Sequence, residues 1–347
     1  KKGNLSDLSN FFKSRKTMIT GAGSIGTELV KQLANLGAGE IVVLDNCELN
    51  LFNLEGNIPE KHREKIKTRL IDLKNKRLLE KVFTEFKPDF VFHTAAYKHV
   101  PIVEQSTDEG VLNNLLCLKN VYEASRKHGI RMLIFISSDK AVRPTNVMGA
   151  TKRLGELYVQ AMNKLDKIVS FSVRFGNVVG SSGSLVPKII NQIQQNAPVT
   201  ITHPEASRFF MLTSEAVLLI LQASVIAKGG EIFILDMGEP IKIVDMVRDI
   251  VAFYGKRSEV DTPIEYIGLR PGEKLSEELV FDEIENKIYK DGMYIAMPNT
   301  FDFRRFVTDY DKMIALANNG DKEKMFDLIA KYVKIYSNEE LSRKGPK

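Results

Sequence analysis

The stretch MITGAGSIGTELV, residues 18–30, decides the fold class. A short apolar run leads directly into a turn with three glycines, and a helical pattern follows at once. Glycines in such a turn let the backbone approach a pyrophosphate, and the first turn of the helix offers N–H groups and the positive end of its dipole. The strand–turn–helix context therefore predicts a dinucleotide-binding turn. Its residues are Gly21, Gly23, Ser24, Ile25 and Gly26.

Short apolar runs alternate with helical patterns over the first half of the chain. They predict strands at 17–20, 41–44, 68–71, 90–93, 132–137 and 168–175, and a later strand at 231–236. Continuous apolar runs are typical of strands that helices cover on both faces. Helical segments at 24–37 and 115–129 fall between them and end in Gly. The alternation predicts an α/β fold, a Rossmann-type doubly wound parallel sheet.

Residues at the ends of the predicted strands indicate which dinucleotide binds. Asp45 closes the second strand, 24 residues after Gly21, near the spacing of about 20 residues for an acid that binds ribose hydroxyls. A carboxylate there repels a 2′-phosphate, so we favour NAD over NADP, with a simple turn residue as the alternative. Two pairs at later strand ends are further candidates, Asp72 with Leu73 beside the adenine and the small Ala95 with Ala96 along the cofactor.

Composition excludes several classes of protein. The 347 residues are 44% hydrophobic and 27% charged, as in ordinary globular proteins, and two cysteines predict no disulfide framework but a reducing cytosol. Five scattered histidines show no metal-ligand spacing, so we assign no metal. The net charge of +5 suits an anionic substrate, but no basic stripe with aromatic residues predicts nucleic-acid binding. No apolar run approaches the roughly 18 residues of a membrane span.

The fifth predicted strand ends in Ser137, Ser138, Asp139 and Lys140. Ligands of open α/β sheets bind beyond the carboxyl ends of the strands, so this cluster should face the nicotinamide. An adjacent acid and amine can divide acid and base roles if the site shifts their pKa values. Lys140 would need a lowered pKa, which burial and a nearby cation such as Lys152 would supply; Lys152 would also bind the nicotinamide ribose. The alternative is a surface ion pair.

Four motifs resemble one enzyme family. They are SSDKAVRPTNVMGATKR (137–153), SVRFGNVVGSSGSLVPK (172–188), ITHPEASRFFM (201–211) and GLRPGEKLSEELV (268–280). Together they are similar to the nucleotide-sugar 4,6-dehydratases among the extended short-chain dehydrogenases, above all the membrane-anchored UDP-N-acetylglucosamine 4,6-dehydratases of bacterial glycan assembly (PglF, WbpM and CapD types). In that branch methionine replaces the tyrosine of Tyr-x-x-x-Lys, as Met148 does here four residues before Lys152. The branch usually has GxxGxxG, whereas this chain has one residue fewer in the glycine turn.

The resemblance implies a reaction and roles for the residues. NAD takes a hydride from carbon 4 of the sugar, water is eliminated across carbons 5 and 6, and the hydride returns to carbon 6. Asp139 is then the acid, Lys140 the base, and Ser138 the partner of the carbon-4 hydroxyl. Met148 cannot take a proton, so Asp139, Lys140 or water must accept the proton of the opening oxidation. The Met-bearing branch implies retention at carbon 5.

The resemblance and the position of the basic residues also indicate a substrate site for a UDP-sugar. Arg270 is expected to head a helix, which suits a diphosphate. The candidate substrate residues are Lys98, His99, Asn177, Lys188, Arg208, Arg270 and Glu273. Lys98 and His99 have a structural role as the alternative, and surface solvation is the alternative for each of the other cations. Arg174 and Asn114 are expected to be structural.

These assignments imply a division of the chain. Residues 1–15 are an N-terminal extension or linker, and 16–178 are the NAD-binding domain, to which 209–240 return. The segments 179–208 and 241–347 form a smaller C-terminal substrate-binding domain and helical part, with helices expected at 241–255, 272–281 and 322–336, the last packing on its own domain. The resemblance also implies a homo-oligomer, and a cytoplasmic domain whose inner-membrane anchor, where one exists, precedes this chain.

Two other functions remain open. A nucleotide-sugar 4-epimerase or reductase would share the fold, but epimerases rely on the missing tyrosine and need no Asp–Lys pair. A non-catalytic NAD-binding sensor would explain the loss of the tyrosine. The presence of Asp139, Lys140 and Lys152 together argues against it.

Overall fold

A computed structural model describes residues 5–180, 185–257, 260–280, 287–296, 300–337 and 340. Its centre is a nine-stranded sheet, and every neighbouring pair from β3 to β11 is parallel. This confirms the Rossmann-type order and the predicted strands to within two residues at their ends. From one edge the strands are β3 (Ile66–Leu70), β2 (Glu40–Asp45), β1 (Lys16–Thr20), β4 (Phe90–His93), β5 (Met132–Ile136), β6 (Val169–Arg174), β11 (Ile232–Leu235), β15 (Met293–Ala296) and β14 (Lys287–Lys290).

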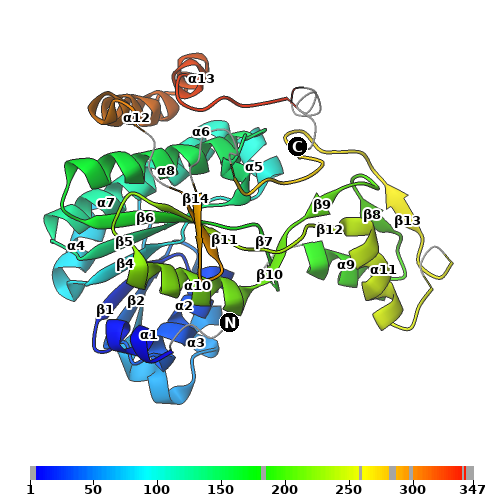
Figure 1. Cartoon of the computed structure of the whole chain (residues 1–347), viewed down its shortest axis with the longest axis horizontal. Coiled ribbons are helices and arrows are strands. Elements are labelled where there is room, and N and C mark those ends of the chain that lie inside the picture. Colours follow the sequence, from blue (N-terminus) through cyan, green and yellow to red (C-terminus); the bar gives the residue numbers. More distant parts are fainter. Residues whose placement is uncertain are drawn as a thin grey trace.

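Helices cover both faces of this sheet, as the continuous apolar strands predicted. Figure 1 shows one layer beneath the sheet and a thicker one above it. The lower layer, with one hydrophobic core, contains α1 (Leu5–Phe12), α2 (Ser24–Asn35), α3 (Glu48–Gly56) and α10 (Thr213–Ile226). The upper layer contains α4 (Lys76–Phe86), α7 (Cys117–Lys127), α8 (Val147–Leu165), α12 (Phe303–Asn318) and α13 (Lys322–Ala330). Shorter turns join these elements: α5 (Val100–Gln105), α6 (Thr107–Val111), a π-helical turn η2 (Leu112–Leu116), and 3₁₀ turns η1 (Glu60–Lys65) and η3 (Asp139–Ala141).

Helix α8, which carries Met148 and Lys152, is buried on all sides. Its residues from Val147 to Met162 are all buried, because the sheet covers one side and α12 lies across the other (Figure 1). Tyr158 of α8 stacks on Tyr310 of α12 with ring centroids 4.3 Å apart. The C-terminal helices thus pack on the main sheet domain, and the expected helix at 322–336 exists over Lys322–Ala330.

Three segments differ from the predicted division of the chain. Residues 5–12, expected within an extension or linker, form α1, whose Leu8 and Phe12 lie in the lower core. The hairpin of β14 and β15 adds two antiparallel strands to the sheet. Both the hairpin and α12 therefore join the main domain, although they fall within the range 241–347.

A smaller unit with its own apolar core stands beside the sheet, at the right of Figure 1. It contains α9 (Leu185–Gln194), α11 (Ile243–Phe253), the parallel pair β8 (Val199–Ile201) and β13 (Ile264–Tyr266), and the antiparallel pair β9 (Ser207–Arg208) and β12 (Ile241–Lys242). The parallel pair β7 (Asn177–Val179) and β10 (Phe210–Leu212) leads from the sheet into it. The expected helix at 241–255 corresponds to α11.

Candidate active site

The candidate catalytic pair lies just beyond the carboxyl end of β5. Asp139 and Lys140 form the 3₁₀ turn η3, and the Ser138 side chain caps this turn by accepting from the Lys140 N–H at 3.2 Å. Helix α8 packs directly against the turn, because a side chain at Gly149 would come within 2.2 Å of the Lys140 carbonyl oxygen. The turn is thus fixed from both sides at the edge where α/β sheets bind ligands.

Asp139 and Lys140 form an ion pair with each other. The Lys140 Nζ lies 3.0 Å from Asp139 Oδ1, which also accepts from the Ser138 hydroxyl at 2.8 Å and from the Lys140 N–H at 2.8 Å. Asp139 is 1% exposed, and its second oxygen, Oδ2, has no hydrogen-bond partner among the described residues. The pair is therefore an acid–base couple of a buried carboxylate and a half-buried lysine, with one carboxylate oxygen left for a further contact.

The charge state of Lys140 differs from the expectation. Burial acts to lower the pKa of Lys140, but the carboxylates of Asp139 and Glu277 outweigh it, and the pKa is raised. Lys152 is not the neighbouring cation, because its Nζ donates to the Ile136 carbonyl at 2.8 Å. The lowered pKa that a base role for Lys140 would need is therefore not present in the chain alone.

The segment 270–280 lies against the catalytic turn, and it is not the helix predicted at 272–281. Over 271–280 the described chain forms turns and extended backbone, with a positive φ of 75° at Gly272. The backbone carbonyls that a helix would use are bound elsewhere: Arg208 donates to Lys274 O and Leu275 O, each at 2.9 Å. Arg270 therefore heads no helix, and helix-dipole binding of a phosphate is not its role.

Met148 and Lys152 lie on the first turns of α8. Met148 is 2% exposed and packs in the upper hydrophobic core. Lys152 is also buried, with its ammonium over the Phe135 ring at 5.0 Å. Burial lowers the pKa of Lys152 to about 8, and Glu156 only partly opposes this effect. The methionine thus contributes packing at this position, while the lysine remains the one ionisable group of the motif.

The glycine turn fits a close backbone approach by a ligand. A side chain at Gly26 would come 1.8 Å from the Gly21 carbonyl oxygen, and one at Gly21, where φ is +93°, would meet Thr94 Oγ1 at 2.7 Å. A side chain at Gly23, in contrast, would meet no described protein atom within 4 Å. Gly21 and Gly26 are therefore required by the fold, whereas the space at Gly23 is left for something other than protein. Ser24 and Ile25 begin α2 directly behind it.

Two of the predicted cofactor residues at the strand ends, Asp45 and Ala95, contact this turn. Asp45 is buried and its Oδ2 accepts from the Ala22 N–H at 2.7 Å, which links the end of β2 to the turn. The backbone of Ala95 packs against Gly21, and Ala96 follows it along the same edge. Asp72 Oδ1 accepts from the Lys74 N–H at 2.9 Å, while the Leu73 side chain is buried in the core. The residues present fit a dinucleotide, with the α2 N-terminus and Gly23 for its pyrophosphate and Asp45 beside it.

The predicted substrate residues fall into three groups. Lys98 lies close enough to Lys140 to be influenced by its charge: burial and then Lys140 lower the pKa of Lys98. His99 follows Lys98 in the chain, and burial and then Lys98 lower the pKa of His99. Lys188 lies near Arg270, which adds to the effect of burial in lowering the pKa of Lys188. Arg208 Nη2 lies 2.9 Å from Glu273 Oε1, and Asn177 stands in β7, which pairs with β10. Residues 181–184 of the predicted GSSGSLVPK loop lie outside the described residues.

Comparisons with known proteins agree with this architecture. The model of the family described as "Polysaccharide biosynthesis protein" matches residues 17–298. The chain belongs to this family. It is 40% identical over 326 residues to the capsular polysaccharide biosynthesis protein CapD of Staphylococcus aureus, covering 92% of this chain and 54% of CapD. It is 31% identical to a UDP-glucose 4-epimerase of Rickettsia bellii, and the match covers 88% of this chain and 90% of the epimerase. The chain thus spans about half the length of CapD.

Solved structures confirm the fold of this family member. Pen from Bacillus thuringiensis is 33% identical, with a TM-score of 0.78 over 83% of this chain and 90% of Pen. The dTDP-glucose 4,6-dehydratase DesIV of Streptomyces venezuelae, solved with NAD, is 17% identical. Its TM-score is 0.67, and the match covers 77% of this chain and 88% of DesIV. The second likeness shows the shared fold alone.

Two features are absent from the described residues. No helix there is both long enough and apolar enough to span a membrane. No group of three or more His, Cys, Asp and Glu side chains in that part of the chain could hold a metal ion.

A buried charge network supports the strand end behind the catalytic pair. Glu156 of α8 is fully buried and accepts from Arg174 Nη2 at 2.8 Å, Arg153 Nη1 at 2.9 Å and Ser137 Oγ at 2.6 Å. Arg174 is structural, as expected. Asn114 is also structural, since its side chain joins Thr151 of α8 to the backbone of Tyr97.

The sequence did not reveal two buried charged residues of the 270–280 segment. Glu277 Oε1 lies 3.3 Å from Lys140 Nζ, and Lys274 Nζ donates to the Val142 carbonyl at 2.6 Å. Both belong to the GEKLSEELV motif and would share one face of the predicted helix, but the sequence does not indicate that they meet the catalytic turn. Only the contact with the catalytic turn shows that they face the site.

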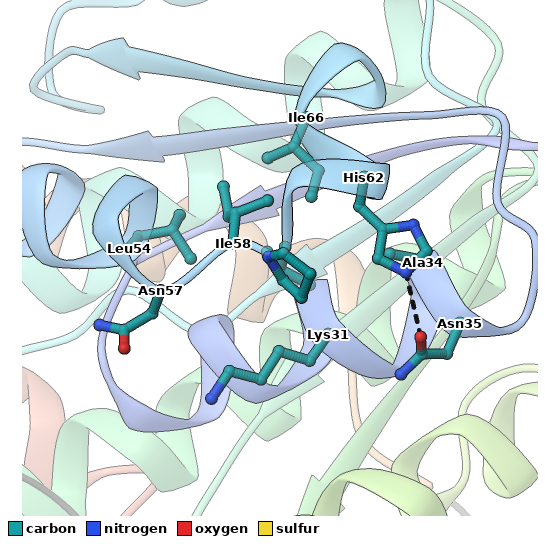
Figure 2. A pocket seen from close by; sticks show the side chains of 10 residues that line it. Lys31, Ala34, Asn35, Leu54, Asn57, Ile58, His62 and Ile66 are labelled. Carbon is teal, nitrogen blue, oxygen red and sulfur yellow. Dashed lines mark hydrogen bonds between the residues drawn. The ribbon is translucent and has the colours of Figure 1, made fainter.

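A separate pocket lies away from this site. Figure 2 shows it between α2, α3 and the η1 turn, with Leu54, Ile58 and Ile66 among its walls and His62 bonded to Asn35. Ile66 begins β3 and Asn35 ends α2, so the pocket is at the amino-end edge of the strands. It therefore has no part in the chemistry of the catalytic pair.

Proposed function

We propose that this protein is an NAD-dependent nucleotide-sugar 4,6-dehydratase that converts UDP-N-acetylglucosamine to the UDP-4-keto-6-deoxy sugar for bacterial glycan synthesis. The observation that carries the proposal is the ion pair of the buried Asp139 with the half-buried Lys140 at the end of β5, combined with a buried methionine where a catalytic tyrosine would stand. Membership of a polysaccharide biosynthesis family supports a nucleotide sugar as the substrate.

NAD would supply the hydride acceptor and donor of this reaction. The glycine turn, the α2 N-terminus and Asp45 are the groups that would hold it, with Lys152 as the partner of the nicotinamide ribose. Asp45 would favour NAD over NADP, because a buried carboxylate repels a 2′-phosphate.

Proton transfer across the sugar would depend on Asp139 and Lys140. Elimination of water needs a neutral amine to take the carbon-5 proton and a carboxylic acid to protonate the carbon-6 hydroxyl. The observed ion pair contains the same number of protons as that neutral pair. One proton moved from Lys140 Nζ to Asp139 Oδ1, over 3.0 Å, interconverts the two. The pair thus needs no proton from solvent to begin the elimination.

The nucleotide would occupy the smaller unit. Lys188 and Arg270 are close enough to influence each other electrostatically, and two neighbouring cations suit a diphosphate. Glu273 and Arg208 would border the nucleotide, while Lys98 and His99 beside Lys140 would border the sugar. Asn177, on β7 between the two units, would contact the substrate where it crosses from one unit to the other.

The test is incubation with UDP-N-acetylglucosamine and NAD in deuterated water, followed by NMR of the sugar. A 4-keto-6-deoxy product with deuterium at carbon 5 and no net NADH supports the proposal, and retained configuration at carbon 5 is expected. A 4-epimeric sugar would instead identify an epimerase, and NAD binding without turnover a sensor.

A further inference from the structure

Lys140 is held between two carboxylates that come from separate segments. Its Nζ lies 3.0 Å from Asp139 Oδ1 on the catalytic turn and 3.3 Å from Glu277 Oε1 on the 270–280 segment. The Glu277 side chain is only 3% exposed. A glutamate at this depth is uncommon unless it is paired, and its nearest cations are Lys140 and, at 3.9 Å, Arg208 Nε.

Several contacts fix the segment that carries Glu277. Thr145 Oγ1 and Asn146 Nδ2 donate to the Gly272 carbonyl at 2.7 and 2.9 Å. Arg143 forms an ion pair with Glu278, the residue next to Glu277. These bonds join residues 143–146, just after the catalytic turn, to residues 272–278. They therefore hold Glu277 in place against Lys140.

The cluster holds more carboxylate oxygens than it satisfies. Asp139 Oδ2 and Glu277 Oε2 are both buried without a hydrogen-bond partner among the described residues. Each of these two oxygens can therefore accept a further hydrogen bond. The charged groups that change the pKa of Lys140 are Asp139, Glu277 and Arg208. Burial lowers the pKa values of Lys98 and Lys274, and the charge of Lys140 in turn adds to this effect.

We propose that Glu277 is a positioning residue that holds the Lys140 ammonium against Asp139 and so determines where their shared proton rests. The proposal deepens the proposed function, since the shared proton is the one that elimination needs. Glu277 touches no reacting atom in this role; it acts through Lys140.

The proton balance shows what Glu277 contributes. Before elimination the pair is a neutral amine and a carboxylic acid; Lys140 then takes the carbon-5 proton and Asp139 gives its proton to the departing hydroxyl, which leaves as water. The step ends in an ammonium and a carboxylate. A second carboxylate 3.3 Å from the ammonium stabilises this end state, and without it the pair loses its shared proton at lower pH.

The first experiment measures the Lys140 amine without substrate or cofactor. Trace acetylation with acetic anhydride across pH 7 to 11, read by mass spectrometry, gives the pH at which Lys140 becomes reactive. Replacing Glu277→Gln should lower this midpoint by about one to three units, a 10- to 1,000-fold faster labelling at a fixed lower pH. Glu278→Gln, one residue along and paired with Arg143, is the matched control and should leave the midpoint within about half a unit.

Activity gives the second readout. In Glu277→Gln the alkaline limb of the kcat profile should move to lower pH by the same shift as the labelling midpoint, with KM changed less than kcat. Glu277→Asp keeps the charge. It should shift the alkaline limb and the labelling midpoint by less than half of the shift expected for Glu277→Gln. Because labelling needs no turnover, failure of the dehydratase assay would leave this result standing.

An unchanged labelling midpoint in Glu277→Gln would overturn the proposal. So would an equal shift in Glu278→Gln, because any lost negative charge nearby would then have the same effect. If Glu277→Gln does not fold, Glu277→Asp decides, because its shorter side chain moves the carboxylate away from Lys140: a labelling midpoint below that of wild type supports the proposal, and an unchanged midpoint refutes it.

Discussion

Glu156→Gln tests the buried network that supports the catalytic strand end. Glu156 accepts from Nε and Nη2 of Arg174, from Arg153 and from the Ser137 hydroxyl, and neither Glu156 nor Arg174 has any exposed surface. Glutamine has nearly the same shape but no charge. The change therefore leaves a fully buried arginine without its counter-ion, while packing stays the same.

The expected loss of stability follows from this burial. Removing one partner of a buried ion pair costs about 3 to 5 kcal/mol, because the other charge stays buried without compensation. A chain of 347 residues has an unfolding entropy of about 0.7 kcal/mol/K. The apparent midpoint of thermal unfolding should therefore fall by about 4 to 7 °C.

The effect should depend on pH in one direction. Burial acts to raise the pKa of Glu156, but Arg174, Arg153 and their hydrogen bonds outweigh it, and the pKa is lowered from 4.5. A lowered pKa in the folded state means that the charge stabilises the fold above the unfolded-state value and stops doing so as pH falls through the folded-state value. The difference between wild type and Glu156→Gln should thus be full near pH 7 and shrink below about pH 4.5.

Thermal and urea unfolding of both proteins at pH 7 and at pH 4 would measure this difference. Glu85→Gln is the control, because Glu85 pairs with Lys81 on the exposed face of α4 and such a pair contributes about 0 to 1 kcal/mol. If Glu156→Gln lost no more than the control at pH 7, or lost more at pH 4 than at pH 7, the reasoning would be refuted.

Three further predictions concern the site. Lys140→Ala should abolish elimination while NAD affinity stays within about twofold, since Lys140 touches the catalytic turn and not the glycine turn; near-normal turnover would contradict the base assignment. Gly26→Ala should destabilise the fold by about 1 to 3 kcal/mol by overpacking against Gly21. Gly23→Ala should leave the melting temperature of the free protein unchanged and weaken NAD binding at least tenfold, as measured by calorimetry. Asp45→Asn should narrow the preference for NAD over NADP, and an unchanged ratio of their dissociation constants would exclude Asp45 from the ribose site.

Local patterns were sufficient to predict the sheet domain. The apolar runs and the glycine turn depend on neighbours in sequence, so strands β1 to β6, β11 and the position of Asp139 and Lys140 follow from them. The contacts that decide the 270–280 segment are of long range. Arg208, more than 60 residues away in sequence, takes the carbonyls that a helix would have used, and no periodicity within the segment reveals this.

The direction of the Lys140 pKa change could not be predicted from the sequence either, because it also depends on long-range contacts. A lysine at a strand end beside another lysine on the next helix suggested a lowered pKa, but Lys152 is directed at the Ile136 carbonyl and Glu277 occupies the other side of Lys140. The sign of the pKa change thus depends on which of two distant groups lies within about 4 Å. Only the packing of the 270–280 segment against the catalytic turn decides the sign.

Methionine at position 148 is consistent with this arrangement of charges. A tyrosine there would bring a phenol that needs a hydrogen-bond partner wherever it is buried, whereas Met148 packs into the upper core without one. With the phenol absent, Asp139, Lys140 and Glu277 form the charged cluster at the catalytic turn, where two carboxylates share one ammonium. Under the proposed reaction, Asp139, Lys140 or water must then accept the proton of the opening oxidation, and Asp139 Oδ2 is buried without a hydrogen-bond partner among the described residues. The same cluster would thus both replace the tyrosine in the oxidation and perform the elimination.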